Sequence, residues 1–542
     1  MASTNTTYQS VYHAFAASAA SYGDHPFLFM VSDTAERYGI SPGAISYAAA
    51  MAEVQKLTHW YQQKGWTPGE RVAIGLDNRP ECFTHWLALN ALGLSVVPLN
   101  PQWQSAELEY VLDHSDARGA VVLPQYQDSV SAAAQAAAPL CQVLCTDLID
   151  TSTSSAAGEP LGTLATECAL LYTSGTTGKP KGCMLSNQYY LTTGQWYLDL
   201  DGYCETTPGN DRLVTPLPMY HMNAMATSTM AMLMSGSCIV PLDRFHPSTW
   251  WSSVAECDAT IIHYLGVMPA MLMSLPPSEH DQAHNIRFGF GAGLSGELHT
   301  AFEERFSISL IEAWAMTETG CTVAVIANNE PRKVGTACFG RPPAHLDYRL
   351  VDDEGNDAAQ GQPGELLVRR AGNDPKFGFF SGYLKDEEAT AAAWQDDFFH
   401  TGDLVYIDDD GLMHFVDRKK NIIRRSGENI SAVEVEEVIL EHPAVQGVGV
   451  AAVPDEIRGD EVLACVLSNT PAAQWPDTAR SIVEHCLSRL AYYKAPGYLA
   501  KTDALPLTPT EKIQRAGLKD LAAELRGADN TIDTRDMKRR RG

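Results

Sequence analysis

Residues 170–182 read LLYTSGTTGKPKG, an apolar run that ends in hydroxyls, glycines and two lysines. The pattern predicts a strand that leads into a loop for an anionic ligand, because glycines let the backbone approach while hydroxyls and ammonium groups bind anionic oxygens. A Walker loop is excluded, because it needs four residues between its first glycine and its Gly-Lys pair. A solvated turn is the alternative. The candidate residues are Thr173, Ser174, Gly175, Thr176, Thr177, Gly178, Lys179 and Lys181.

Length and charge limit the class of protein. With 542 residues, of which 45% are apolar, the chain is too long for one core and predicts a large and a small domain. Its net charge of −27 repels nucleic acids and anionic membranes, so we expect neither as a partner. A protein that acts on small molecules fits better. The oligomeric state stays open between a monomer and a homodimer.

Targeting signals and cysteine frameworks are also not indicated. No apolar run approaches the ~20 residues that cross a bilayer, and the polar start MASTNTTYQS does not resemble a secretion signal. We therefore expect a cytoplasmic protein without membrane insertion. The 12 cysteines are scattered without a C-x-x-C pair, which indicates reduced thiols and neither zinc nor disulfides.

Strand and helix patterns alternate in the first part of the chain, which predicts a parallel sheet covered on both faces. Two later strand patterns around a turn-rich stretch predict a small β-subdomain, and 408–411, DDDG, predicts a solvated hairpin turn in preference to a metal site. The fold class is therefore α/β, with doubly wound sheets in a large domain and a small mobile α+β domain. The expected domains are 1–420 and 421–542, and the expected helices include 44–64, 79–92 and 105–115.

The string YTSGTTGKPKG closely resembles the signature loop of the adenylate-forming superfamily, which holds acyl-CoA synthetases, peptide-synthetase adenylation domains and luciferases. Further motifs follow in the family's order, from roughly residue 25 to residue 520. The strings FVDRKKNIIRRSGENIS and AAVPDEIRGDE look most like acyl-CoA ligases, including the crotonobetaine/carnitine-CoA ligase type. The resemblance implies ATP, Mg²⁺ and coenzyme A as cofactors and a small carboxylic acid as substrate.

Two stretches are typical of nucleotide contacts. In RFGFGAGLS, 287–295, glycines let a flat ring approach the backbone, and an aromatic ring at Trp314 could stack on its face. The family usually has Tyr-Gly where this chain has Trp314-Ala315. The resemblance implies that Thr317 contacts phosphate and that Glu318 holds magnesium, whereas a Thr-Glu pair elsewhere is typical of a helix N-terminus. The adenine candidates are Gly291, Ala292, Gly293 and Trp314.

The later motifs resemble the family's ribose contacts, hinge and pantetheine-tunnel face. In HTGD, 400–403, the match implies that Asp403 accepts both ribose hydroxyls, and Arg418 is implied as a second ribose contact. Lys420 matches the hinge, and Gly427 matches the face that forms the pantetheine tunnel. Without the family, RKKN at 418–421 would be an exposed basic patch.

Lys512 lies in LPLTPTEKIQR, 505–515, a stretch rich in Pro and Thr. A single surface lysine is usually only a solvated charge. The segment resembles the family's last motif, whose lysine enters the active site, although Leu507 replaces a common basic residue and Glu511 a common glycine. Attack of a carboxylate on the α-phosphate of ATP brings two anions together, so the implied role of Lys512 is to bridge them.

His221 follows the apolar strand pattern 212–217 and is either a cleft residue or a hydrogen-bonded structural histidine. The resemblance implies that it borders the acyl pocket. The methionines between 222 and 234 indicate core packing, with Met222 as the exception. The acyl-pocket candidates are Trp196, Tyr220, Met222, Tyr264 and Met268.

The expected reaction joins an acid to CoA through an acyl adenylate, with rotation of the small domain between the two half-reactions. A short polar or small branched acid is the first hypothesis, while aromatic residues could instead hold an aryl acid or a quaternary ammonium group. The acyl group could also pass to an amine or a carrier-protein thiol. A non-catalytic binding protein is the third reading, although Lys512, Glu318 and Asp403 are all present.

Overall fold

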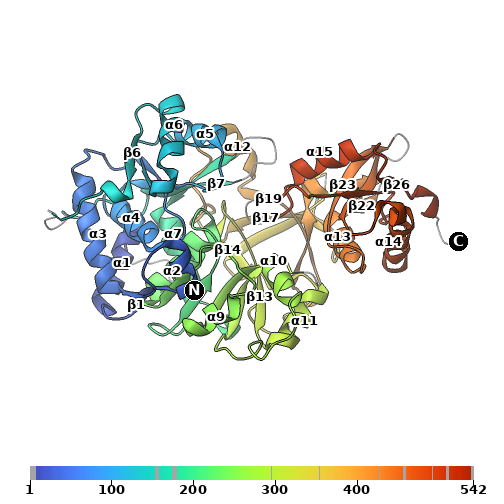
Figure 1. Cartoon of the computed structure of the whole chain (residues 1–542), viewed down its shortest axis with the longest axis horizontal. Helices are drawn as coiled ribbons and strands as arrows, with labels where there is room; N and C mark the ends of the chain where they lie inside the picture. The colour runs from blue at the N-terminus through green and yellow to red at the C-terminus, as the bar shows by residue number, and fades with distance from the viewer. Residues whose placement is uncertain are drawn as a thin grey trace. The chain divides into compact units, whose positions relative to one another are not determined.

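The computed structural model describes residues 8–152, 158–173, 180–294, 296–352, 354–425, 428–455, 459–490, 492–507 and 512–538 (Figure 1). Two compact units divide the chain. The first unit comprises residues 1–347 and 368–399, and the second comprises 348–367 and 400–542. The boundary expected at Lys420 stays a prediction. Among the described residues, no helix is long and apolar enough to cross a membrane.

The first unit contains a large mixed sheet whose central strands are parallel. Strands β13 and β14, at one edge of this sheet, form an antiparallel hairpin. In spatial order the strands are β14 (Gly320–Ile326), β13 (Ser309–Met316), β12 (Phe288–Ala292), β11 (Ile261–Leu265), β9 (Arg212–Thr215), β10 (Cys238–Pro241), β1 (Pro26–Met30) and β2 (Gly43–Ser46).

A second sheet in the same unit is parallel except for its last pair, β7 and β8. Every residue of β4 and β5 is buried, as expected for strands covered on both faces. The predicted parallel sheet is therefore confirmed. The order is β6 (Gln142–Cys145), β5 (Gly119–Val122), β3 (Arg71–Gly75), β4 (Ser95–Pro98), β7 (Glu167–Thr173) and β8 (Lys181–Ser186).

Helices of the first unit pack on these sheets. The first long helix begins at Tyr47 and not at residue 44, because Gly43–Ser46 pairs with β1 as strand β2 and Ser46 then caps the helix. The helices are α1 (Val11–Ser21), α2 (Ser32–Tyr38), α3 (Tyr47–Gln62), α4 (Pro80–Ala91), α5 (Ser105–His114), α6 (Gln127–Ala137), α7 (Asn187–Leu198), α8 (Thr229–Ser235), α9 (Trp250–Glu256), α10 (Val267–Met273), α11 (Gly296–Phe306) and α12 (Glu387–Ala393).

The expected small β-subdomain is present as strands β20 (Met413–Arg418), β19 (Phe398–Ile407), β17 (Gly364–Arg370) and β16 (Leu346–Val351), which are neighbours in that order. The hairpin expected at 408–411 joins β19 to β20. Asp408 accepts hydrogen bonds from the Asp410 and Leu412 amides at 3.0 and 2.9 Å, so its carboxylate holds the turn. No cluster of three metal-ligating side chains occurs among the described residues.

The end of the second unit is an α+β layer, as expected from the sequence. Helices α13 (Ala432–Leu440), α14 (Trp475–Arg489) and α15 (Arg515–Leu525) accompany a sheet of β21 (Ile423–Arg425), β22 (Glu428–Ile430), β23 (Gly447–Asp455), β24 (Gly459–Leu467), β25 (Tyr498–Thr502) and β26 (Thr531–Asp533). Apolar side chains of α13, α14 and β24 form one core. All 12 cysteines of the chain are buried free thiols.

A buried charge network lies inside this layer. Glu461 is fully buried and accepts hydrogen bonds from the Arg425 Nε at 2.9 Å and from the Lys538 Nζ at 2.6 Å. Neutralising Glu461 would leave two buried cations without their shared anion. Loss of one partner from such a network typically costs about 3–5 kcal/mol.

We expect Glu461→Gln to lower the opening free energy of the β23–β25 amides by about 3–5 kcal/mol in native-state hydrogen exchange. The matched control is Asp536→Asn, because Asp536 forms an ion pair at 3.2 Å with Arg480 in which both side chains are exposed. The control should change the same amides by less than about 1 kcal/mol. Equal effects of the two substitutions would contradict the inferred role of burial.

Candidate active site

Thr317 and Glu318 lie in the tight turn of the β13–β14 hairpin. The hairpin pairs Met316 with Gly320, and the backbone oxygen of Thr317 accepts a hydrogen bond from the Tyr189 hydroxyl at 2.9 Å. Gly320 has φ +55° and lies against the Tyr189 ring, so a side chain there would be strained and would collide. The turn therefore presents both candidates at the end of two strands.

A segment distant in sequence holds Glu318 in place. We call residues 377–384 the strap. The Phe380 amide donates to the Glu318 backbone oxygen at 2.9 Å, and the Tyr383 hydroxyl donates to its Oε1 at 2.8 Å. Burial and the nearby charge of Glu318 raise the pKa of Tyr383, so this hydroxyl stays protonated and donates. The sequence prediction did not include the strap.

The strap also lies along the strand that follows the expected phosphate loop. The Met184 amide donates to the Gly382 oxygen at 3.0 Å, and the Leu384 amide donates to the Gly182 oxygen at 2.8 Å. The Lys181 ammonium lies 4.9 Å from the centroid of the Tyr383 ring. Tyr383 therefore contacts both the metal candidate and a lysine of the loop motif.

The ends of the loop motif are paired as a hairpin. Thr173 and Lys181 are opposite each other in β7 and β8, and the Lys181 ammonium is 3.6 Å from the Asp386 carboxylate. Both candidates thus flank the chain between the two strands. The other loop candidates lie outside the described residues, namely Ser174, Gly175, Thr176, Thr177, Gly178 and Lys179.

Three adenine candidates lie at the end of β12, and the fourth, Trp314, lies on β13. A Cβ at Gly291 would collide with the Tyr264 carbonyl, and Gly293 has φ +88°, so both positions require glycine. The Gly293 amide donates to the Glu312 Oε2 at 3.1 Å. Ala292 is half-buried at the strand end. Trp314 is 6% exposed, so most of its ring is covered within this unit.

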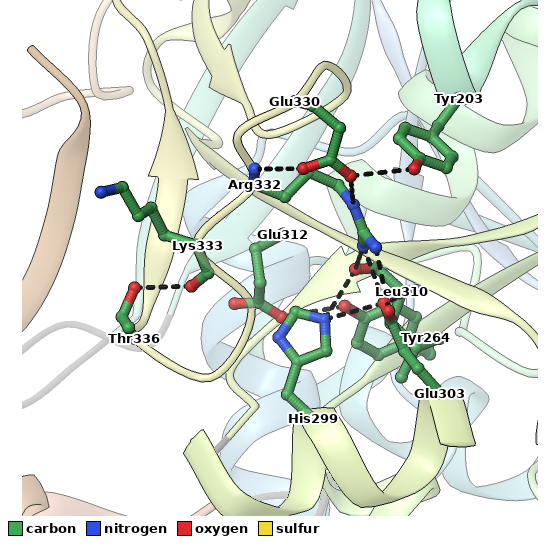
Figure 2. A network of polar contacts seen from close by, with 10 residues as sticks. All are labelled: Tyr203, Tyr264, His299, Glu303, Leu310, Glu312, Glu330, Arg332, Lys333 and Thr336. Carbon is green, nitrogen blue, oxygen red and sulfur yellow. Dashed lines mark hydrogen bonds and ion pairs between the residues drawn. The ribbon is translucent and has the colours of Figure 1, made fainter. Parts of the chain in front are cut away.

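Figure 2 shows the polar network beneath these residues. The Tyr264 hydroxyl donates to the Glu312 Oε1 at 2.8 Å, and burial raises the pKa of this carboxyl. Arg332 donates from both terminal nitrogens to Glu303. Burial opposes ionisation of Glu303, but hydrogen bonds from Arg332 and His299 outweigh it and lower its pKa to about 2. These contacts tie β13 to β11 and α11.

Tyr220, His221 and Met222 form a half-buried turn before the π-helical segment η4 (Asn223–Ser228). The rings of Tyr220 and His221 meet edge to face at 4.7 Å. The buried Asn78 holds the preceding chain, because it donates to the Leu217 oxygen at 3.0 Å and accepts from the Met219 amide at 3.0 Å. The sequence prediction missed Asn78, which carries no local signal.

A second histidine was also missed. His263 is fully buried on β11, with its Nδ1 2.8 Å from the Ser228 hydroxyl and its Nε2 3.0 Å from the Tyr197 hydroxyl. Burial lowers its pKa to about 3, so the imidazole is neutral. Because Ser228 ends η4, this contact supports the segment that follows His221. The one sequence signal for His263 was its place as a polar residue inside an apolar strand pattern.

The five acyl-pocket candidates do not share one environment. Tyr264 and Met268 are buried, and the Tyr264 hydroxyl is engaged by Glu312. Tyr220 and Met222 belong to the half-buried turn described above. Trp196 lies on α7, where it is half-buried and lines a separate cavity.

In the second unit, the ribose candidates contact each other. The Arg418 Nε lies 2.6 Å from the Asp403 Oδ1, and Asp403 is almost fully buried. Glu365, which the sequence prediction missed, accepts from the Gly402 amide at 3.3 Å and from the Lys419 ammonium at 2.8 Å. The Asp403 carboxylate of HTGD is therefore paired with Arg418, and the neighbouring Glu365 is paired with Lys419.

Asp417, also missed, organises the expected hinge. Its carboxylate accepts hydrogen bonds from Asn421 at 3.2 Å, from the Ser431 hydroxyl at 2.9 Å and from the Val433 amide at 3.2 Å. Lys420 lies in the 3₁₀ turn η5 (Lys419–Asn421), after Asp417 and before its three donors in sequence. The side chain of Lys420 and all of Gly427 lie outside the described residues.

Lys512 lies on irregular chain, one residue before an isolated bridge residue and three residues before α15. Leu507 pairs with Ile513, and Arg515 donates from Nη2 to the Glu436 carboxylate on α13 at 2.7 Å. These contacts fix both sides of Lys512. The side chain itself is exposed, while desolvation by nearby protein atoms and then the charge of Arg418 lower the pKa of its ammonium group.

Glu318 fits a magnesium ion that is shared with a phosphate. Its Oε1 accepts from Tyr383, and its Oε2 accepts no hydrogen bond from the described residues. Mg²⁺ commonly takes one or two carboxylates together with substrate phosphates and water. A single buried carboxylate beside a lysine is therefore a suitable donor set.

Comparison with protein families gives two matches along the chain. Residues 15–384 match the family described as AMP-binding enzyme, and residues 434–512 match the AMP-binding enzyme C-terminal domain. The crotonobetaine/carnitine–CoA ligase of Shigella sonnei (strain Ss046) is 30% identical over 492 residues, which cover 88% of this chain and 93% of that ligase.

Solved structures share the fold. An anthranilate CoA ligase in complex with anthranoyl-AMP superposes with a TM-score of 0.84 at 22% identity, covering 97% of this chain and 100% of that one. The o-succinylbenzoate coenzyme A synthetase of Bacillus subtilis, in complex with ATP and a magnesium ion, gives a TM-score of 0.78 at 23% identity, with 93% and 98% covered.

We expect Tyr383→Phe to weaken the affinity for Mg²⁺ in the presence of ATP by about 10-fold or more. A hydrogen bond that orients a metal-ligating carboxylate typically has an effect of that size. Mg²⁺ titration at fixed ATP measures it. Tyr203→Phe is the matched control, because Tyr203 also donates to a carboxylate, Glu330, at 2.9 Å, but on the surface. A Tyr383→Phe protein with the wild-type magnesium dependence would contradict the assignment of Glu318.

Proposed function

This chain belongs to the AMP-binding enzyme family, and from that membership we propose that it is an ATP-dependent acid–CoA ligase. In the proposed reaction, a carboxylate oxygen attacks the α-phosphate of ATP, which gives an acyl adenylate and pyrophosphate. The thiol of CoA then attacks the acyl carbon and displaces AMP, which gives a thioester. The observation that best supports the proposal is the Glu318 carboxylate, held at a hairpin turn by Tyr383 beside Lys181.

The first half-reaction needs positive charge, because two anions meet in a site where their repulsion is stronger than in water. Magnesium, when bound at Glu318, would neutralise charge on the leaving pyrophosphate. Lys181 and the hydroxyl of Thr173 are proposed to hold the same phosphates. Lys512 is proposed to supply the charge between the carboxylate and the α-phosphate.

We propose adenine and ribose contacts from separate stretches of the sequence. Gly291, Ala292, Gly293 and Trp314 are the adenine candidates, and two requirements for glycine at 291 and 293 support a close approach to the backbone. Asp403 is proposed to accept the ribose hydroxyls. Arg418 already neutralises this carboxylate, so a neutral sugar adds no unpaired charge.

The second half-reaction needs no nucleophile from the protein, because AMP is a good leaving group and CoA brings the thiol. The cysteines agree with this assignment. All 12 are buried, and burial raises the pKa of Cys321 to about 12, which keeps that thiol protonated near the hairpin. We propose that the small domain turns about Lys420 between the half-reactions and that Gly427 then borders the pantetheine chain of CoA.

The acid is proposed to be short and polar or small and branched. The names of the relatives include betaine and aryl acids, which keeps those two classes as alternatives. An aromatic cage that joins Trp196, Tyr220, Tyr264 and Trp314 has little support, because Tyr264 and Trp314 are buried and the Tyr264 hydroxyl donates to Glu312. His221 and Tyr220 remain proposed as borders of the acyl site.

We expect Lys512→Ala to slow acyl-adenylate formation by about 100- to 1,000-fold, because it removes charge stabilisation of the transition state. Thioester formation from supplied acyl adenylate should stay near the wild-type rate. Single-turnover assays of each half-reaction measure this. Lys519→Ala is the matched control, because Lys519 is an exposed lysine on the neighbouring α15. An equal loss in both half-reactions would refute this division of labour.

The proposed activity is tested by pyrophosphate release with ATP, magnesium and a panel of short, branched, aryl and betaine acids, with and without CoA. We expect one class of acid to release pyrophosphate, with CoA raising turnover to AMP and a thioester. Release that CoA does not change would indicate an amine or a carrier-protein thiol as acceptor. No release with any acid would contradict the ligase proposal.

A further inference from the structure

A cavity of about 640 Å³ lies in the first unit between α7 and β14. One wall is a stripe of α7 at helical spacing, Thr192, Gln195 and Trp196, continued by Asp199 just after the helix, and another is the face of β14 that includes Thr322. Its lining includes none of the expected nucleotide residues. The volume lies within the range of typical small-molecule sites.

Arg370 and His345 lie on the third wall. The Arg370 guanidinium donates to the Thr322 carbonyl at 2.8 Å, and it forms no ion pair with any carboxylate in the described part of the chain. Desolvation lowers the pKa of this arginine, as expected for a covered cation without a counter-ion. A half-buried charge of this kind is stabilised by an anion that binds beside it.

His345 stands beside this arginine. Its Nε2 is buried and makes no hydrogen bond with the described residues. Burial, and then the charge of Arg370, lower its pKa to about 4, so the ring is neutral and has an unused polar atom. Unsatisfied buried groups are uncommon in native proteins and need an explanation. A ligand oxygen at this wall would serve both residues.

The opposite rim does not supply the missing anion. Asp199 is exposed and accepts a hydrogen bond from Gln195 at 2.7 Å, and Asp201 accepts from the Asn329 side chain at 3.0 Å. Both carboxylates therefore have polar partners of their own. They also make the rim unfavourable for a second negative charge on the ligand, which limits the ligand to one anionic end.

The middle of the cavity is suited to a flat apolar body. Trp196 is half-buried, and its ring is fixed edge to face against Phe290 on β12 at 6.2 Å. Phe377, the first residue of the strap, is a second aromatic on the lining. Aromatic side chains with a rigid position contribute large contact area to a planar ligand.

We propose that this cavity binds a small monocarboxylate with a planar apolar body, with its carboxylate on Arg370 and His345 and its body against Trp196. Binding itself does not depend on the proposed function. The carboxylate has two possible sources, the acid that the enzyme activates or a separate effector, and only the first rests on the ligase assignment.

The strap connects the cavity with Glu318. The Thr322 hydroxyl donates to the Phe377 oxygen at 2.9 Å, and Gly378 packs against Thr322 with φ +76°, where a Cβ would collide. Phe380 and Tyr383, later in the same segment, hydrogen-bond Glu318. A ligand that moves Phe377 therefore acts on the segment that positions the magnesium candidate.

The probe is 2-naphthoate, titrated by calorimetry into the full chain, with neutral 2-naphthamide as the ligand control. We expect one naphthoate site, at least tenfold weaker binding of naphthamide, and at least tenfold weaker naphthoate binding by Arg370→Gln. Arg369→Gln is the matched control, because the neighbouring Arg369 forms an ion pair with Asp347 at 3.2 Å. Trp196→Leu and His345→Gln test the other contacts if Arg370→Gln folds poorly.

Absence of saturable binding by the wild-type protein would overturn the proposal, as would unchanged binding by all three cavity variants. Where binding depends on these residues, ATP and magnesium identify the source. Pyrophosphate released with naphthoate identifies the cavity as part of the acid site. Bound naphthoate that releases none, but changes pyrophosphate release with an active acid, identifies an effector site. Failure of the ligase proposal leaves the binding result intact, so the two failures are distinguishable.

Discussion

The hydrogen bond from Tyr383 to Glu318 joins two side chains that are 65 residues apart in sequence. It fixes the one buried carboxylate at the β13–β14 turn, and the same tyrosine lies under the Lys181 ammonium. The strap that carries Tyr383 also hydrogen-bonds the strand after the loop motif. The strand after the loop motif, the Glu318 turn and the strap therefore share direct hydrogen bonds.

Hydrogen bonds among the neighbouring strands support this assembly. Glu312 receives hydrogen bonds from Tyr264 and from the Gly293 amide, while Arg332 binds the Glu303 carboxylate with two nitrogens (Figure 2). These contacts hold the end of β12 against β13. Glu312 and Arg332 are buried and hydrogen-bonded there, and the adjoining turn has a positive φ at Gly293 that glycine adopts without strain.

Local patterns in the sequence were enough for the sheets, the hairpin at 408–411 and the order of the motifs. The residues that hold the motifs were not predictable in this way. Asn78, His263 and Asp417 each act on partners far away in sequence or across a turn, and no periodicity marks them. The strap is similar, because FGFFSGYL indicates only turns and aromatic packing until its backbone partners are known.

Asp417 has a particular consequence for the proposed rotation. Its carboxylate precedes Lys420 in sequence, whereas Ser431 and Val433, which donate to it, follow Lys420. A rotation of the backbone at Lys420 either keeps Ser431 and Val433 next to Asp417 or breaks both hydrogen bonds. Each hydrogen bond to a charged group contributes roughly 1–3 kcal/mol. Since Asp417 is 1% exposed, a broken arrangement would also leave a buried carboxylate unsatisfied unless water or new donors replace them. The proposed rotation about Lys420 therefore has to keep or replace the hydrogen-bond donors of Asp417.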